Sequence, residues 1–307
     1  MDVHTAASLS ADDAWEAFKG KYGKVYNGDE EEHKATYLAN MQWAAENSND
    51  EVQFGENQFA DLTTEQYRVA AGLGYKAMNS GLPHLGVHEY AGEELAASVD
   101  WTTQGAVTPV KDQGQCGSCL AFSTTGGMEG AWQIGTGSLT SMSEQQLVDC
   151  STQNACCNGG SMELAFNYAG TTNVATESSY PYTARDGTCK TSYTTAVPKG
   201  GITGYKSVGQ STDSLKSAIQ NGPVSVAIEA DQFAFQLYSG GVLSSGCGTN
   251  LDHGVLAVGY DSNSFKVKNS WGTSWGNNGY VQISQSGNTC GIHSDASYPT
   301  VSGSVSV

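Results

Sequence analysis

The spacing of apolar residues predicts helices in the N-terminal third of the chain and again before its middle. Trp15, Phe18 and Tyr22 recur at helical intervals, and a second, longer helical period runs through residues 30–48. A third apolar segment of helical character covers residues 119–134. Each of these segments is long enough to bury one face against the rest of the protein.

Two segments in the last third have the patterns of strands. Residues 255–260, Val-Leu-Ala-Val-Gly-Tyr, form an apolar run typical of a buried strand, and residues 265–268 alternate like a second strand. Residues 72–92 are rich in Gly and have no sustained period, which predicts an extended, cleavable linker. The chain is therefore expected to contain helices, strands and one long exposed connection.

Composition and charge exclude several classes of partner. With 307 residues and 38% hydrophobic content, the chain can form one large or two medium globular domains. The net charge of -17, with -11 in residues 1–94 and -6 in 95–307, argues against nucleic acid or an anionic membrane. No run of 18 apolar residues predicts a membrane span. The first eight residues lack the basic and apolar regions of a signal peptide, so such a signal is expected to have been removed from this chain.

The clearest candidate chemistry lies in residues 112–119, Asp-Gln-Gly-Gln-Cys-Gly-Ser-Cys. Gln113 stands six residues ahead of Cys119, and Cys119 opens the third predicted helix. A thiol at a helix N-terminus faces the positive end of the helix dipole, which favours the reactive thiolate. Cys119 is therefore the candidate nucleophile, and the amide of Gln113 is the candidate donor to an oxyanion.

A nucleophilic Cys needs a base, and the base needs a group that holds its orientation. His253 stands at the start of the strand over 255–260, and Asn269 follows the strand over 265–268, where its amide could accept from an imidazole nitrogen. Each residue also has a structural alternative: Gln113 capping a turn, His253 as a core histidine, and Asn269 ending a strand. The order Gln, Cys, His, Asn favours the catalytic interpretation.

Several further blocks occur in the order of one known family. The chain resembles a papain-family cysteine protease of the cathepsin L type with its prosegment still attached, and the resemblance covers nearly the whole chain. The blocks that carry it are 113–123, 143–150 (Ser-Glu-Gln-Gln-Leu-Val-Asp-Cys), 157–160 (Cys-Asn-Gly-Gly), 222–226 (Gly-Pro-Val-Ser-Val), the segment around His253, and 269–276 (Asn-Ser-Trp-Gly-Thr-Ser-Trp-Gly).

The resemblance implies an α+β, papain-like fold of two domains with the active site in the cleft between them. It assigns residues 1–94 to an inhibitory prosegment and linker, and 95–307 to the protease domain. The left half of that domain is expected to be helical, and the right half an antiparallel β-barrel over about 224–283. The prosegment is expected to lie over the cleft and to pass through it in the direction opposite to a substrate.

The resemblance also implies roles for individual residues. Cys119 and His253 form the thiolate-imidazolium pair, Asn269 orients His253, Gln113 and the backbone N–H of Cys119 hold the oxyanion, and Trp271 shields the contact between Asn269 and His253. No cofactor is implied. The expected partners are peptide and protein substrates and the chain's own prosegment, with the protein a monomer in a lysosome or vacuole, or secreted.

Two motifs support the prosegment, against the alternative of an unrelated helical extension. The first matches poorly, because Lys34, Ala44 and Ser48 depart from the family's residues; its positions are Glu30, Lys34, Tyr37, Asn40, Ala44 and Ser48. The second is complete, with Gly55, Asn57, Phe59 and Asp61. The mature start corresponds to Leu-Ala-Ala-Ser-Val-Asp-Trp at 95–101, so cleavage is expected near Glu94.

Eight cysteines leave an odd number once the nucleophile is kept free. The resemblance implies the disulfides Cys116–Cys157, Cys150–Cys189 and Cys247–Cys290. Cys156 is then unpaired, although it could replace Cys157 as the partner of Cys116. A zinc site of Cys116, Cys119, Cys156 and Cys157 is disfavoured because adjacent cysteines lack the spacing of a zinc knuckle. Three disulfides favour an oxidising or lysosome-like compartment.

Substrate specificity is expected to depend on Asp295. Alignment from Cys290 places Asp295 at the floor of the family's S2 pocket, and relatives with an acid there, such as cathepsin B and the trypanosomal enzymes, also accept Arg. The alternative is a solvated Asp before the final strand. The other substrate-binding residues implied are Gly159, Gly160, Ser161, Met162, Ala227, Leu251, Gly254 and Trp271.

One departure from the family lies beside the nucleophile. Leu120 replaces the usual Trp, and Leu has neither the area nor the N–H of an indole. This change keeps a second class of function open, a papain-like binding or scaffold protein that cleaves poorly. A silica-templating structural relative is disfavoured, because such proteins carry Ser in place of the nucleophile. His293 is interpreted as a structural residue near the specificity pocket.

Overall fold

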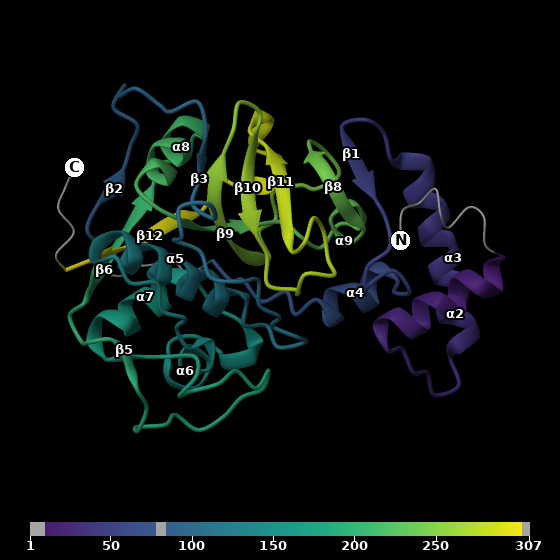
Figure 1. Cartoon of the computed structure of the whole chain (residues 1–307), viewed down its shortest axis with the longest axis horizontal. Coiled ribbons are helices and arrows are strands. Elements are labelled where there is room, and N and C mark those ends of the chain that lie inside the picture. Colours follow the sequence, from purple (N-terminus) through teal and green to yellow (C-terminus); the bar gives the residue numbers. More distant parts are fainter. Residues whose placement is uncertain (1–9, 78–83, 303–307) are drawn as a thin grey trace.

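Three regions can be followed in Figure 1: a pair of helices at the N-terminal end, a large twisted sheet, and a helical half packed beside the sheet. The structure is a computed structural model that describes residues 10–77 and 84–302. The expected absence of a leader concerns residues 1–8, which lie outside the described residues, as does the part of the expected linker from 78 to 83. Within the described residues, no helix has the length and apolar character needed to cross a membrane.

The N-terminal helices are defined by their caps and by an aromatic core. The elements are α2 (Ala11–Tyr22), α3 (Glu30–Asn47), β1 (Val52–Phe54) and α4 (Thr64–Ala70). The Ser10 hydroxyl accepts from the N–H of Asp13 at the start of α2, and Gly23 ends the helix in the left-handed conformation. Phe18 and Tyr37 are buried with their ring centroids 4.6 Å apart, so they join α2 to α3.

The sheet contains ten strands, most of them antiparallel. Their order is β1-β8-β11-β10-β9-β7-β12-β6-β2, with β3 pairing with β9 off this path. The bounds are β2 (Val87–His88), β3 (Val99–Asp100), β6 (Ile202–Val208), β7 (Val224–Ile228), β8 (Tyr238–Leu243), β9 (His253–Tyr260), β10 (Ser264–Lys268), β11 (Tyr280–Ser284) and β12 (Ala296–Val301). The pairs β8–β11 and β2–β6 are parallel.

The sheet is larger than the segment 224–283 expected from the sequence. It takes in β6 and β12 on one side, and it continues into the N-terminal third of the chain at both ends. There β1 pairs with β8 and β2 pairs with β6, so the two outer strands come from residues 52–54 and 87–88. An unpaired strand edge exposes backbone donors and acceptors, and these short strands cover both edges.

The helical half surrounds α5, which begins at the candidate nucleophile. The remaining elements are α5 (Cys119–Thr136), α6 (Glu144–Cys150), the 3-10 helix η1 (Cys156–Asn158), α7 (Met162–Thr171), the paired strands β4 (Val174–Ala175) and β5 (Thr195–Val197), α8 (Thr212–Gln220), α9 (Phe233–Gln236) and the 3-10 segment η2 (Ser286–Gly291). A Cβ atom on Gly126 would lie 2.6 Å from Leu256 Cδ2, so α5 packs closely on β9 at this glycine and a larger residue would require the Leu256 side chain to move. This close packing fixes the start of α5 next to the start of β9.

Candidate active site

Cys119 is the first residue of α5 and is completely buried. Burial raises the pKa of its thiol, while the backbone N–H groups of Gly254, Gly74 and Leu120 act in the opposite direction. Gly254 and Leu120 belong to the part of the chain after residue 95, but Gly74 belongs to the N-terminal third. The N-terminal segment therefore reaches the candidate nucleophile itself.

His253 and Asn269 meet because they lie at neighbouring ends of the paired strands β9 and β10. His253 Nε2 lies 2.7 Å from Asn269 Oδ1. Since an amide oxygen only accepts, Nε2 carries the proton, and the lone pair of the neutral ring is on Nδ1. Nδ1 is buried and makes no hydrogen bond to the described residues. Gly254, the next residue, packs against Cys119: a Cβ there would lie 3.5 Å from the Cys119 carbonyl carbon.

Trp271 packs against the ring of His253. The indole is buried and stacks on the imidazole, with 4.8 Å between ring centroids and 24° between planes. Complete burial lowers the pKa of His253 to about 4, and the hydrogen bond that its ring donates to Asn269 only partly opposes this. The raised pKa of the Cys119 thiol and the lowered pKa of the His253 imidazole favour the neutral forms of both groups in this closed form of the chain.

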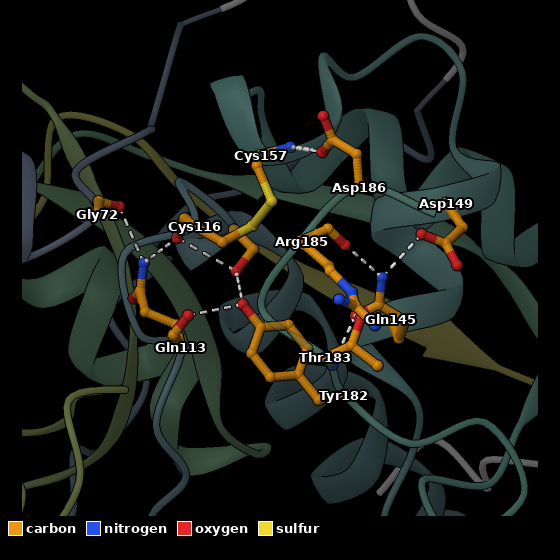
Figure 2. Close-up of a disulfide and its surroundings, with 11 residues drawn as sticks. Gly72, Gln113, Cys116, Gln145, Asp149, Cys157, Tyr182, Thr183, Arg185 and Asp186 are labelled. Carbon is orange, nitrogen blue, oxygen red and sulfur yellow. Dashed lines mark hydrogen bonds between the residues drawn. A yellow bond between two sulfur atoms is a disulfide. The ribbon is translucent and has the colours of Figure 1, made fainter. Parts of the chain in front are cut away.

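Gln113 is buried, and both ends of its amide have partners, of which Figure 2 shows those of Nε2. Its Oε1 accepts from Ser270 Oγ at 2.6 Å, which fixes the orientation of the amide. Its Nε2 donates to the carbonyl of Cys116 at 3.0 Å and to the carbonyl of Gly72 at 2.9 Å. A carbonyl oxygen of the N-terminal third thus occupies the candidate oxyanion donor. Ser270 was not predicted from the sequence, where it reads only as part of the Asn-Ser-Trp-Gly block.

Residues 72–76, named here the cleft strap, bind by backbone pairing. The N–H of Gly160 donates to the carbonyl of Gly74, and the N–H of Lys76 donates to the carbonyl of Gly160, both at 2.9 Å. The N–H of Tyr75 donates to the carbonyl of Asp252, also at 2.9 Å. The bridge between Tyr75 and Gly160 is parallel. Glycines allow this approach, since a Cβ on Gly74 would lie 2.3 Å from the Gly117 oxygen.

The segment before the cleft strap docks on the C-terminal part of the chain beside Trp271. Asn57 Nδ2 donates to the carbonyl of Gln236, and Gln236 Nε2 donates to the carbonyl of Phe59, at 2.8 and 2.9 Å. Phe59 and Tyr67 both meet the Trp271 indole edge-on, with centroids 5.4 and 5.8 Å away. Two residues of the complete second motif therefore hold the N-terminal segment against the indole that covers His253.

The side chain of Tyr75 enters the region expected to be the S2 pocket. It is 4% exposed and belongs to the apolar cluster of Met162 and Ala227, against which Leu251 packs. Its hydroxyl donates to Asp295 Oδ2. Ser161 is buried and caps α7, and a Cβ on Gly254 would lie 3.1 Å from the sulfur of Met162, which places these wall residues together.

The structure joins Cys116 to Cys157, Cys150 to Cys189, and Cys247 to Cys290, which are the pairs that the resemblance implies. Figure 2 shows the first of these bonds close to Gln113. Cys119 and the half-buried Cys156 are free. Across residues 10–77 and 84–302, no group of three or more His, Cys, Asp or Glu side chains is arranged to hold a metal ion.

Leu120 and His293 are packed among neighbouring residues of the protein. Leu120 is 3% exposed and belongs to the same apolar cluster as Met128 and Leu147, inside the helical half. A larger residue there would have to displace packed neighbours. His293 is half-buried beside η2, and burial lowers its pKa. Neither side chain has a contact that assigns it a role in the chemistry.

A buried group of charges behind the active site was not predicted. Lys111 Nζ lies 2.5 Å from Glu144 Oε1 and 3.1 Å from Glu129 Oε1, and Lys268 Nζ donates to Thr108 Oγ1. Burial raises the pKa of Glu144 to about 7. These residues stand apart in the sequence, so no local pattern indicates that they meet. The charged residues of this group line a cavity of about 20 Å³ that also reaches Asn269 and Ser270.

A buried thiol at a helix N-terminus, a histidine oriented by an amide and a covering N-terminal segment define the class of cysteine protease zymogens. The chain belongs to the papain family: residues 95–300 match "Papain family cysteine protease". Residues 15–67 match "Cathepsin propeptide inhibitor domain (I29)", so the N-terminal helices belong to an inhibitory prosegment. The protein is a papain-like cysteine peptidase in its zymogen form, with a papain-like α+β fold.

Named relatives agree with this assignment. Digestive cysteine proteinase 1 of Homarus americanus is 46% identical over 317 aligned residues, covering 96% of this chain and 97% of that protein. Cysteine proteinase 5 of Dictyostelium discoideum is 45% identical over 297 aligned residues, covering 86% and 85%. The structure of digestive procathepsin L 3 from the larval midgut of Tenebrio molitor has a TM-score of 0.85 at 37% identity, covering 96% of this chain and 100% of that one.

Proposed function

We propose that this zymogen yields a cysteine endopeptidase that uses Cys119, His253, Asn269 and Gln113. The observation that carries the proposal is a histidine ring held by Asn269 with its Nδ1 unpartnered, next in the chain to Gly254, which packs against the buried Cys119. Nδ1 takes the thiol proton, and the thiolate attacks the scissile carbonyl. His253 then protonates the leaving amine and activates water for deacylation.

Gln113 supplies the oxyanion donor in this mechanism. Ser270 holds its amide, so Nε2 is oriented before substrate arrives, and the Gly72 carbonyl that it binds in the zymogen marks a position for a carbonyl oxygen. The backbone N–H of Cys119 is the second donor. Loss of one such donor costs about 10² to 10³ in rate, so Gln113→Ala is expected to reduce kcat by about that factor.

Acid-promoted removal of the prosegment near Glu94 activates the enzyme in this proposal, with 1–94 removed and 95–307 retained. In the zymogen, backbone groups of the prosegment contact the nucleophile, the oxyanion donor and the Gly160 backbone. Gly159, Gly160 and Trp271 are then free to contact substrate. The digestive relatives favour a secreted or lysosomal protein, acting on peptide and protein substrates as a monomer.

The S2 pocket is proposed to accept apolar P2 side chains and arginine. Tyr75 supports its position, because a bulky side chain fills it and bonds to Asp295. Ser161, Met162, Ala227, Leu251 and Gly254 form the walls. An ionised Asp295 would bind a guanidinium by charge-assisted hydrogen bonds, so cleavage after Arg-Arg is expected to fall as Asp295 becomes protonated.

The alternative function is a papain-like binding or scaffold protein, motivated by Leu120. Hydrolysis of a fluorogenic Phe-Arg substrate after acid treatment separates the two. The proposal predicts hydrolysis that a thiol-alkylating epoxide abolishes and that both Cys119→Ala and His253→Ala lack. A correctly shortened chain with no hydrolysis would favour the scaffold.

A further inference from the structure

Two carboxylates lie near each other in the region of the proposed S2 pocket that Tyr75 fills. Asp295 lies just before β12, and Glu163 lies in the first turn of α7 with only 8% of its surface exposed. Ser297 Oγ donates to Glu163 Oε1 at 2.7 Å, and the hydroxyl of Tyr75 donates to Asp295. Burial raises the pKa of both acids, and the charge of Asp295 raises that of Glu163 further. The sequence drew attention to Asp295 alone.

Glu163 also acts on the side chain that fills the pocket. The pKa of the Tyr75 hydroxyl is raised by burial first, and also by the charges of Asp295 and Glu163. The phenol therefore lies within the field of both carboxylates. Whatever replaces Tyr75 after the prosegment leaves will meet the same two groups.

This pair of acids has no cation of its own. Within residues 10–77 and 84–302, neither Glu163 nor Asp295 forms an ion pair with Lys, Arg or His. Buried carboxylates in proteins are normally paired, because burying an unpaired charge is costly. In the zymogen the neutral hydroxyl of Tyr75 and the hydroxyl of Ser297 are the partners supplied. The floor of the pocket therefore offers acceptors for a cation that residues 10–77 and 84–302 do not provide.

We propose that the pocket vacated by Tyr75 binds the guanidinium of a P2 arginine through Asp295 and Glu163 together, which makes Glu163 a specificity-determining residue. This inference rests on the proposed protease function. A guanidinium has five donors in a planar fork and can bond two carboxylates at once, whereas an ammonium is a compact, strongly hydrated charge. The pocket is therefore selective for arginine over lysine at P2, and the second acid offsets the short reach of Asp295.

The test compares variants of the full chain after acid activation, with active sites counted by epoxide titration. Glu163→Gln removes the charge but keeps an oxygen that accepts from Ser297. We expect it to lower kcat/KM for an Arg-Arg substrate about tenfold, mainly through KM, and to change Phe-Arg hydrolysis by less than about twofold. Asp295→Asn is expected to act in the same direction. The double variant loses less than the product of the two effects, because both acids bind one guanidinium.

Asp213→Asn is the matched control, since it removes one charge from an exposed position on α8 and should leave both substrates unaffected. Should Glu163→Gln fail to fold, Glu163→Asp withdraws the carboxylate by one methylene and is expected to lower the Arg-Arg to Phe-Arg ratio as well. An unchanged ratio in either folded variant, with Phe-Arg hydrolysis intact, overturns the inference alone. A parent enzyme that hydrolyses neither substrate overturns the proposed function and the inference with it.

Discussion

Replacing Gly74 with alanine would place a methyl group against the backbone of the protease half. The added Cβ would lie 2.3 Å from the Gly117 oxygen and 2.8 Å from its carbonyl carbon and Cα, whereas real Cβ contacts essentially never fall below 3.0 Å. No flexible side chain is available to move aside, because all three atoms belong to the backbone. The cleft strap must therefore shift by about 0.7 Å or more, since peptide geometry is stiff.

That shift acts on the hydrogen bonds that hold the cleft strap. The N–H of Gly160 loses good geometry to the Gly74 carbonyl, and the neighbouring N–H of Tyr75 loses it to Asp252. Each of these two bonds contributes about 1 kcal/mol, and the residual strain adds about 1 kcal/mol more. A total near 3 kcal/mol corresponds to roughly a hundredfold weaker closure of the cleft.

The rate at which a thiol-reactive epoxide labels Cys119 in the full-length chain at neutral pH measures this closure. Gly74→Ala is expected to label roughly a hundred times faster than the parent. Gly20→Ala is the control, because Gly20 lies in α2 of the same prosegment and a Cβ there has no atom within 4 Å. Labelling of Gly74→Ala at the parent rate would refute the argument that the cleft strap closes the site by backbone contact.

Three further predictions follow from the buried site. Closure keeps His253 neutral by lowering its pKa to about 4, so this group's contribution to closure, about 3 kcal/mol, is complete above about pH 6.5 and is lost as pH falls toward about 4. In a Cys119→Ala chain, which should not cleave itself in isolation, we expect His253→Leu to reduce prosegment release at pH 4 to 5, measured by hydrogen exchange. Burial raises the pKa of Asp252 to about 7, so protonation of Asp252 at low pH favours the closed form and opposes the effect of His253. Unchanged release in His253→Leu would show that other groups drive the response to acid. Leu120→Trp is expected to lower the free energy of unfolding by about 1 to 3 kcal/mol, because Leu120 is packed in the core; a rise in kcat without loss of stability would instead identify the residue as a wall of the active site. Tyr75→Phe removes the hydroxyl bonded to Asp295 and should speed acid processing severalfold. Electrophoresis measures the rate of processing, and a rate equal to that of the parent would contradict this prediction.

Local motifs in the sequence placed the candidate catalytic residues at the ends of elements that the structure also contains. Cys119 opens a helix, and His253 and Asn269 lie at the ends of two strands, so each could be placed from its own neighbourhood. The antiparallel pairing of β9 with β10 then brings the two strand ends together. Residues whose role depends on the secondary structure beside them were therefore accessible to sequence reasoning.

Sequence reasoning did not identify the residues whose role depends on packing between distant segments. Residues 72–76 read only as part of a Gly-rich linker, because their path is fixed by Gly160 and Asp252 far along the chain. Glu163 looks like any acid in the first turn of a helix, where it complements the helix dipole, and its burial against Asp295 appears only when α7 packs beside β12. The widening of the sheet by β1 and β2 likewise comes from pairing between segments, which no periodicity encodes.

Covalent labelling of the nucleophile, followed by intact mass, tests the central claim that one chain carries both a Cys119 protease and its own inhibitor. The full-length chain is incubated with a thiol-reactive peptidyl epoxide at pH 7, and a second sample is first held at about pH 4 to 5. The account predicts negligible labelling of the closed chain at pH 7, and a single label on Cys119 in an acid-treated product that has lost about 94 residues. Rapid labelling of the intact chain at pH 7, or an acid-treated product that takes no label at Cys119, would contradict it.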